Sequence, residues 1–199
     1  GPSEVSFPIH IVVIDKDGLT DPKDIRNKKR SIILINNGIH PGEPEGIDAS
    51  MIFARKMVLD KASLAYLIRV TIIIIPIYNI GGSLLRNSTS RVNQNGPMAY
   101  GFRGNRQNLD LNRDFIKCDS KNAKTFSNIF NQWNPDILID NHTSDGADYT
   151  YNITLLASQR NKLNVILGDY MYNKFIPSIY ASMNLLNEPL VPYVNVEDI

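Results

Sequence analysis

Two histidines and one glutamate are spaced so that their side chains could bind one metal ion. His40 and Glu43 are three residues apart in the segment His-Pro-Gly-Glu, and His142 follows far later in the chain. Gly42 permits a sharp bend, so the first two side chains can converge. Imidazole nitrogens and carboxylate oxygens are ordinary zinc ligands, and a catalytic zinc site uses three protein ligands with a fourth position left for water. A His-x-x-Glu pair alone also arises by chance, so the placement of these residues in the fold has to support the prediction.

Both histidines follow predicted central strands. An apolar run ends just before His40, and the segment 136–140 leads directly into His142. Open α/β sheets gather their ligands outside the carboxyl ends of the strands. Side chains alternate along a strand, so Asp140 lies on the same side as His142; it either orients the imidazole or acts as a strand-end cap or salt-bridge partner. We interpret the third histidine, His10, as an ordinary core or surface residue.

A second group of polar residues occupies the irregular stretch 79–112 and its end. Arg103 and Arg106 precede Asn112 and Arg113 in a segment that ends Asn-Leu-Asp-Leu-Asn-Arg-Asp-Phe. Guanidinium groups recognise carboxylates through two parallel hydrogen bonds. Loop arginines are also common as solvated surface residues, so the weight of this group comes from the metal-ligand candidates around it. Long irregular stretches in compact domains are usually functional or mobile, which favours a substrate-facing loop region.

The elements that must position these residues alternate between strands and helices. Apolar runs predict strands at 9–14, 31–36, 70–75, 136–140 and 150–157, and helical periods follow Pro44, cover 123–133 and start at 163. The polar residues between the first two strands predict a turn, and hence a hairpin or a neighbouring pair. The run 70–75 has no polar alternation, which is typical of a central strand covered on both faces. We predict an α/β fold with a mixed, largely parallel sheet and helices on both faces, in a single domain over 1–199.

The composition is that of one soluble globular domain, with 199 residues, 43% hydrophobic and 21% charged. A net charge of +1 gives no electrostatic case for a nucleic-acid partner. The apolar runs are much shorter than the ~18 residues that suggest a membrane span. The lone Cys118 cannot form an internal disulfide. The chain starts Gly-Pro-Ser without a Met, typical of a cloning remnant, so the absence of a leader carries no weight.

Together, His40-Pro-Gly-Glu43, Asn112-Arg113 and a His142 that follows an apolar strand resemble the zinc carboxypeptidase family, in residue type and in chain order. The resemblance covers roughly residues 31–157, and the segment around Arg103 is similar to secreted bacterial members. The family resemblance implies that His40, Glu43 and His142 bind one Zn²⁺ per chain.

The resemblance also implies a function. Asn112 and Arg113 would bind the C-terminal carboxylate of a peptide substrate, and Arg103 would polarise the scissile carbonyl, with Arg106 as the alternative for that role. The protein would then be a metallocarboxypeptidase that hydrolyses the C-terminal peptide bond, and by the same resemblance it would be secreted or periplasmic.

The chain departs from the family pattern after His142. Family members need a general-base Glu on a late strand and a mobile Tyr. Tyr193 cannot be assigned to the mobile Tyr. No acidic residue after His142 can be assigned to the general base; these residues are Asp145, Asp148, Asp169, Glu188, Glu197 and Asp198. We therefore expect the N-terminal part of a catalytic domain, truncated at its C-terminal side and weakly active or inactive by itself. An uncovered sheet edge would favour homo-oligomers.

Two alternative functions share this pattern. One is a zinc-dependent deacylase of N-acyl amino acids, of the aspartoacylase or succinylglutamate desuccinylase type, which has the same His-x-x-Glu, Asp-Leu-Asn-Arg and distant His. The other is a non-catalytic module that binds zinc and carboxylates.

Overall fold

The computed structural model describes residues 1–91, 97–144 and 149–193. The chain divides into two compact units, Gly1–Gly146 and Ala147–Ile199, and the single domain expected from the sequence stays a prediction. No helix in the described ranges is long and apolar enough to cross a membrane.

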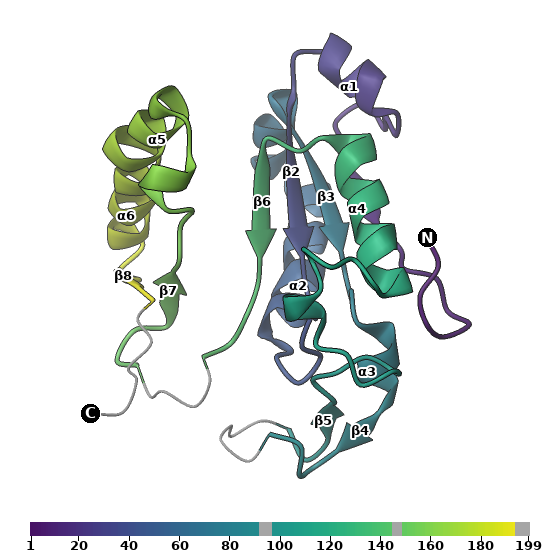
Figure 1. The fold of residues 1–199 in the computed structure, drawn as a ribbon. Coiled ribbons are helices and arrows are strands. Elements are labelled where there is room, and N and C mark those ends of the chain that lie inside the picture. Colours follow the sequence, from purple (N-terminus) through teal and green to yellow (C-terminus); the bar gives the residue numbers. More distant parts are fainter. Residues whose placement is uncertain (92–96, 145–148, 194–199) are drawn as a thin grey trace. The chain divides into compact units, whose positions relative to one another are not determined.

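A four-stranded sheet forms the centre of the first unit (Figure 1). Its strands are β1 (Val12–Ile14), β2 (Ser31–Asn36), β3 (Val70–Ile75) and β6 (Ile137–Asp140), in the order β1-β3-β2-β6. β2 pairs in parallel with β3 and with β6, whereas β1 runs antiparallel to β3. The predicted mixed, largely parallel sheet is confirmed.

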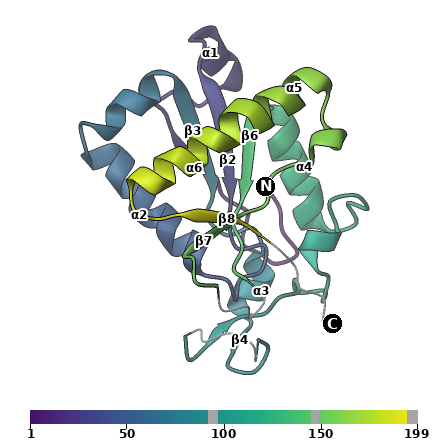
Figure 2. The same ribbon diagram turned by 90° about the vertical axis from the view of Figure 1, so that its left-hand side faces the viewer.

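Helices cover both faces of this sheet, and Figure 2 shows α2 and α4 on opposite sides of it. The helical elements are α1 (Pro22–Asn27), α2 (Glu45–Leu59), the 3-10 helix η1 (Ser63–Ile68) and α4 (Lys121–Trp133). Alternate residues of β3 point to opposite faces. Ile73 therefore packs in the cluster that includes Trp133 of α4, while Ile72 packs with Met57 of α2.

Short elements lie beyond the carboxyl ends of β2 and β3, in the stretch predicted to be irregular (Figure 1). They are α3 (Ile80–Leu84), β4 (Arg86–Asn87), β5 (Tyr100–Gly101) and the 3-10 turn η2 (Leu111–Arg113). β4 and β5 pair antiparallel as a small separate sheet. These elements bring the arginine-rich segment to the sheet edge at which the histidines were expected.

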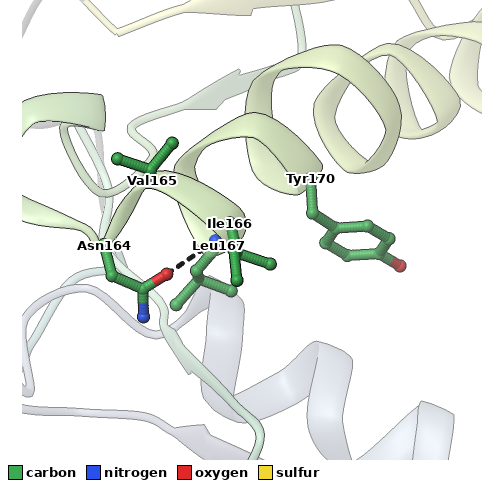
Figure 3. Close-up of a pocket in the computed structure, with 5 residues that line it drawn as sticks. All are labelled: Asn164, Val165, Ile166, Leu167 and Tyr170. Atoms are coloured by element: carbon green, nitrogen blue, oxygen red, sulfur yellow. Dashed lines mark hydrogen bonds between the residues drawn. The ribbon is translucent and has the colours of Figure 1, made fainter.

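The second unit contains a parallel pair of strands and a helical segment. Its elements are β7 (Ile153–Leu155), the 3-10 turn η3 (Arg160–Lys162), α5 (Val165–Tyr170), the π-helical turn η4 (Met171–Phe175), α6 (Ile176–Leu185) and β8 (Leu190–Pro192). Asn164 caps α5 by accepting a hydrogen bond from the backbone N–H of Leu167, at 2.8 Å. Side chains of this first turn border an open depression (Figure 3).

The first two strands form neither the predicted hairpin nor a neighbouring pair, because β3 lies between β1 and β2. The polar residues 22–27 form helix α1 instead of a turn. Asp21 caps this helix by accepting from the backbone N–H of Lys23, Pro22 occupies its first turn, and Ile25 is fully buried. One apolar residue on an otherwise polar helix was too weak a signal to read from the sequence.

The prediction that 136–140 is a central strand is only half right. β6 exists, but Leu138 and Ile139 are 43% and 41% exposed. β2 is the strand that pairs with β6 in the described residues, which leaves β6 at an edge of the sheet.

Candidate metal centre

The turn between β2 and α2 carries the first two predicted ligands. Gly38 has a φ of +64°, a conformation that glycine adopts without strain, and it starts the turn. The backbone N–H of Glu43 donates to the carbonyl oxygen of His40 at 2.9 Å, which closes the turn. His40 and Glu43 are 2% and 4% exposed, so both polar side chains are buried.

The third predicted ligand, His142, follows β6 at the same edge of the sheet. Parallel pairing places Asn36 of β2 beside Asp140 of β6, so the two strands end together. The side-chain amide of Asn141 then donates to Asn37 Oδ1 at 2.8 Å and ties the loop after β6 to the loop after β2. The His142 side chain remains 31% exposed.

The three predicted ligands converge on one point. Nδ1 of His40 lies 3.0 Å from Glu43 Oε1, and Nδ1 of His142 lies 3.0 Å from Glu43 Oε2. The backbone N–H of Thr143 also donates to Oε2, at 3.0 Å. One ligand atom from each of the three side chains lies within 4.8 Å of the others. Two imidazoles and one carboxylate at this separation fit a catalytic zinc ion.

Carboxylates hold the outer nitrogen of each imidazole. His40 Nε2 lies 3.1 Å from Asp110 Oδ1, and His142 Nε2 lies 3.1 Å from Asp140 Oδ2. Asp140 is itself held by the side-chain amide of Asn36, at 2.9 Å. Such partners fix the ring orientation and make the other nitrogen a better ligand. Of the two interpretations of Asp140, the contact with His142 favours the orienting one.

The charges around Glu43 keep its carboxylate ionised. Burial by itself would raise the pKa of Glu43, but hydrogen bonds from His142, His40 and the Thr143 N–H outweigh it and lower the pKa far below its usual range. Burial likewise opposes the charged form of His142, yet the contacts with Asp140 and Glu43 raise its pKa to about 9. Protons and a metal therefore compete for the same ring nitrogen.

The structure brings one of the predicted arginines to these ligands. Arg103 Nε donates to Asp110 Oδ2 at 3.0 Å, and Arg103 Nη1 lies 3.4 Å from His40 Nδ1. Arg106 is exposed, and no ion pair of its side chain is found among the described residues. Of the two candidates for polarising the carbonyl, Arg103 is therefore the one beside the metal ligands.

Asn112 and Arg113 lie on η2, directly after Asp110. The backbone N–H of Asn112 donates to Asp110 Oδ1 at 2.9 Å, so one aspartate joins this turn to His40. Arg113 is exposed, and its Nη1 donates to the carbonyl oxygen of Asn112 at 3.1 Å. Neither side chain contacts the metal ligands in the described residues.

Sequence reasoning missed two residues that contact the ligands. Asp110 was part of a recognised segment, but no role was assigned to it. Arg91 was not singled out, although its Nη1 lies 3.0 Å from Glu43 Oε1. An arginine in an irregular stretch is a weak signal by itself, and its partner is 48 positions away along the sequence.

The late acidic residues provide no assigned base. Asp145, Asp148, Glu197 and Asp198 lie outside the described residues. Asp169 pairs with Arg160, and Glu188 accepts from the side-chain amide of Asn152 at 2.7 Å. Both of these contacts are made within the second unit.

Comparison with known families identifies the class of this protein. The model of the zinc carboxypeptidase family matches residues 4–178, and the chain belongs to that family. Zinc is the metal that this family uses, in agreement with the two histidines and one glutamate at the sheet edge. A search of curated proteins found no match.

Solved structures of carboxypeptidases share the fold. A proposed carboxypeptidase from Burkholderia mallei matches with a TM-score of 0.67 and 15% identity, over 96% of this chain and 44% of that one. A proposed carboxypeptidase A from Shewanella denitrificans matches with a TM-score of 0.62 and 17% identity, over 96% of this chain and 44% of that one. A metallo-carboxypeptidase from Burkholderia cenocepacia matches with a TM-score of 0.53 and 16% identity, over 72% of this chain and 35% of that one. The chain thus spans less than half the length of these proteins.

Proposed function

We propose that the native protein is a zinc-dependent metallocarboxypeptidase that hydrolyses the C-terminal peptide bond of peptides. The observation that carries this proposal is the convergence of His40, Glu43 and His142, whose ligand atoms lie within 4.8 Å of one another. Membership of the zinc carboxypeptidase family supports it. A bound zinc ion would supply a Lewis acid and an activated water molecule.

The residues around the ligands prepare the site. Asp110 and Asp140 engage the Nε2 atoms, so both Nδ1 atoms are directed at Glu43. Because the geometry is held by hydrogen bonds to buried or half-buried partners, little reorganisation is needed when a metal binds.

Arginines would bind and polarise the substrate. Arg103 uses Nε to bind Asp110, which leaves the end of its guanidinium beside His40 to stabilise negative charge on the scissile carbonyl oxygen. Arg113, with Asn112, would hold the terminal carboxylate through two parallel hydrogen bonds. That anchor would orient the substrate so that only the last peptide bond reaches the metal.

The general base is assigned to a segment of the native protein other than residues 1–199. The contacts of Asp169 with Arg160 and of Glu188 with Asn152 support this assignment, because neither carboxylate is held towards the three proposed ligands. It also means that a test of catalysis needs the full-length protein.

The test compares release of terminal amino acids by the full-length protein from peptides with a free or an amidated C-terminus. We expect cleavage of the free form only, with loss of activity and zinc in His40→Ala and His142→Ala. Hydrolysis of N-acetyl or N-succinyl amino acids, with no release from peptides, would identify a deacylase instead. Zinc binding without either activity would identify a non-catalytic module.

A further inference from the structure

A buried arginine contacts Glu43, one of the three proposed zinc ligands, and is not itself a ligand. Arg91 Nη1 lies 3.0 Å from Glu43 Oε1, and the two side chains are only 5% and 3% exposed. Two charges removed from water in this way depend on each other, because loss of either partner leaves an uncompensated buried charge. The contact is therefore a built ion pair and not a chance surface contact.

The turn that carries the ligands has room for this arginine only because it contains a glycine. A Cβ at Gly42 would lie 2.5 Å from Arg91 Cδ and 2.9 Å from the carbonyl oxygen of Gly101. The Arg91 side chain thus passes directly over the His-Pro-Gly-Glu turn on its way to Glu43. The packing of Arg91 over Gly42 is an observation independent of the ion pair, and it also connects Arg91 to the turn that carries Glu43.

The backbone of Arg91 is also held in place. Tyr100 Oη lies 3.2 Å from the Arg91 nitrogen and 3.0 Å from the Arg91 carbonyl oxygen, and Tyr100 is 6% exposed. The next residue, Gly101, packs on Pro41, since a Cβ there would lie 2.5 Å from Pro41 Cβ. β5 therefore fixes both the start of the Arg91 side chain and the turn that it crosses.

We propose that Arg91 is a positioning residue that raises the affinity of this site for zinc. The inference rests on the proposed metal-binding role of His40, Glu43 and His142. By holding Glu43 Oε1, Arg91 keeps the carboxylate facing both imidazoles, so metal binding does not have to order it.

Arg91 and a metal need not compete for the same electron pair. Each carboxylate oxygen has two lone pairs. Oε1 contacts His40 and Arg91, while Oε2 contacts His142 and the Thr143 N–H. Arg91 and the Thr143 N–H each use one lone pair of a different oxygen, so the Glu43 carboxylate keeps lone pairs with which it would hold a metal. The repulsion between the guanidinium and a divalent cation is offset by the shared carboxylate between them.

The experiment measures the zinc Kd of this chain by competition with a fluorescent chelator. Residues that orient metal ligands typically change affinity by 10–100-fold. We expect Arg91→Gln to raise the Kd by about tenfold or more. A methyl group at Gly42 meets both Arg91 Cδ and the Gly101 carbonyl oxygen, so Gly42→Ala is measured alone and in the Arg91→Gln background. The part of its effect that acts through Arg91 disappears in the double variant. Arg91→Lys restores part of the affinity. Arg86→Gln is the matched control, since Arg86 is exposed on the neighbouring strand and contacts the Ala99 carbonyl.

A second measurement separates positioning from simple stabilisation. The visible absorption of bound Co²⁺ reports ligand geometry, and we expect it to change in Arg91→Gln and not in Arg86→Gln. An unchanged Kd and spectrum with a lower melting temperature would show a purely structural role, and tighter zinc binding would show competition; either result overturns the inference. If Arg91→Gln does not fold, Arg91→Lys provides the comparison, because it keeps the charge and loses the planar guanidinium.

The two proposals fail in different ways. A folded wild-type chain that binds no zinc contradicts the metal centre itself, and the role of Arg91 with it. A wild-type chain that binds zinc, with the affinity unchanged in Arg91→Gln and Gly42→Ala, contradicts the role of Arg91 alone.

Discussion

The two units of the chain differ in how their apolar side chains are used. The first unit buries two apolar clusters, one on each face of its sheet. In the second unit, Val165, Ile166 and Leu185 are 79%, 85% and 85% exposed. Within residues 149–193, Leu190 is the only large apolar side chain that is buried, at 8% exposed. Apolar burial is the main favourable term in folding. The first unit therefore has a buried core that can hold side chains in a precise geometry, and the second unit has little such burial.

The placement of the candidate metal centre agrees with this difference. His40, Glu43 and His142 all belong to the first unit, as do Arg91, Arg103 and the two aspartates that contact the imidazoles. The second unit forms helices through local signals, such as the Asn164 cap, with little burial to support them. If this difference decides stability, substitutions in the first unit should change the free energy of unfolding much more than substitutions in the second.

The largest effect is expected from a buried ion pair at the other end of the sheet. Arg30 donates to both carboxylate oxygens of Asp15, at 2.9 Å, and the side chains are 6% and 1% exposed. Asp15→Asn leaves Arg30 paired only with the half-exposed Asp17, at 2.5 Å, and places an amide N–H₂ group among donors that now bond to the carboxylate. We expect a loss of roughly 3–5 kcal/mol at pH 7. Urea unfolding followed by the fluorescence of the single tryptophan, Trp133, measures it. A loss below 1 kcal/mol would contradict this account.

The same variant has a defined pH dependence. Burial opposes ionisation of Asp15, but hydrogen bonds from Thr71, the Asp17 and Leu19 N–H groups and Arg30 outweigh it and lower its pKa below 3.8. A folded-state pKa below the unfolded one contributes stability that is present above the unfolded value and is lost as pH falls through the folded value. The difference between wild type and Asp15→Asn should therefore shrink below about pH 3.8. A constant difference down to pH 2 would contradict the shift.

A matched pair of core truncations compares the units directly. Ile73 is fully buried, and we expect Ile73→Ala to cost about 2–5 kcal/mol. Ile166 is 85% exposed, and Ile166→Ala should stay within about 0.5 kcal/mol. Both are measured by urea unfolding. Similar losses in the two variants would contradict the comparison, because they would show that Ile166 contributes to stability as a buried side chain does.

Removing a helix cap in each unit compares the two units through a smaller change in stability. Ser120 Oγ accepts from the Ala123 N–H at 3.0 Å and is buried at the start of α4, so Ser120→Ala should cost about 1 kcal/mol. Asn164 caps the exposed α5, so Asn164→Ala should reduce helicity in circular dichroism without moving the Trp133 unfolding midpoint. A shift of that midpoint would show that the two units unfold together.

The smallest expected effect concerns the exposed edge of the sheet. Leu138 and Ile139 on β6 are 43% and 41% exposed, and an uncovered strand edge favours pairing with another chain. We expect self-association at high concentration in sedimentation velocity, reduced by Leu138→Lys. A wild-type profile that is monomeric at all concentrations would remove the reason to expect homo-oligomers.

Much of the local structure could be predicted from the sequence. Strands 31–36 and 70–75 have the predicted bounds, because their apolar, mostly β-branched residues favour strands and the flanking polar residues end them. The order of the strands could not be predicted. The pairing of β3 between β1 and β2 depends on contacts between distant residues and on helices whose single buried side chains, such as Ile25, leave little trace in a sequence pattern.

The candidate metal ligands could be predicted from the sequence, whereas the side chains that hold them could not. By itself the sequence determined the family and the three ligand candidates, because zinc chemistry restricts the residue types and the order of His40, Glu43 and His142 reflects the fold. Only the tertiary structure decided which side chains support them. Arg91 reaches Glu43 because β5 packs on the ligand turn and Gly42 leaves room, and contacts of this kind depend on the packing of two loops far apart in the chain.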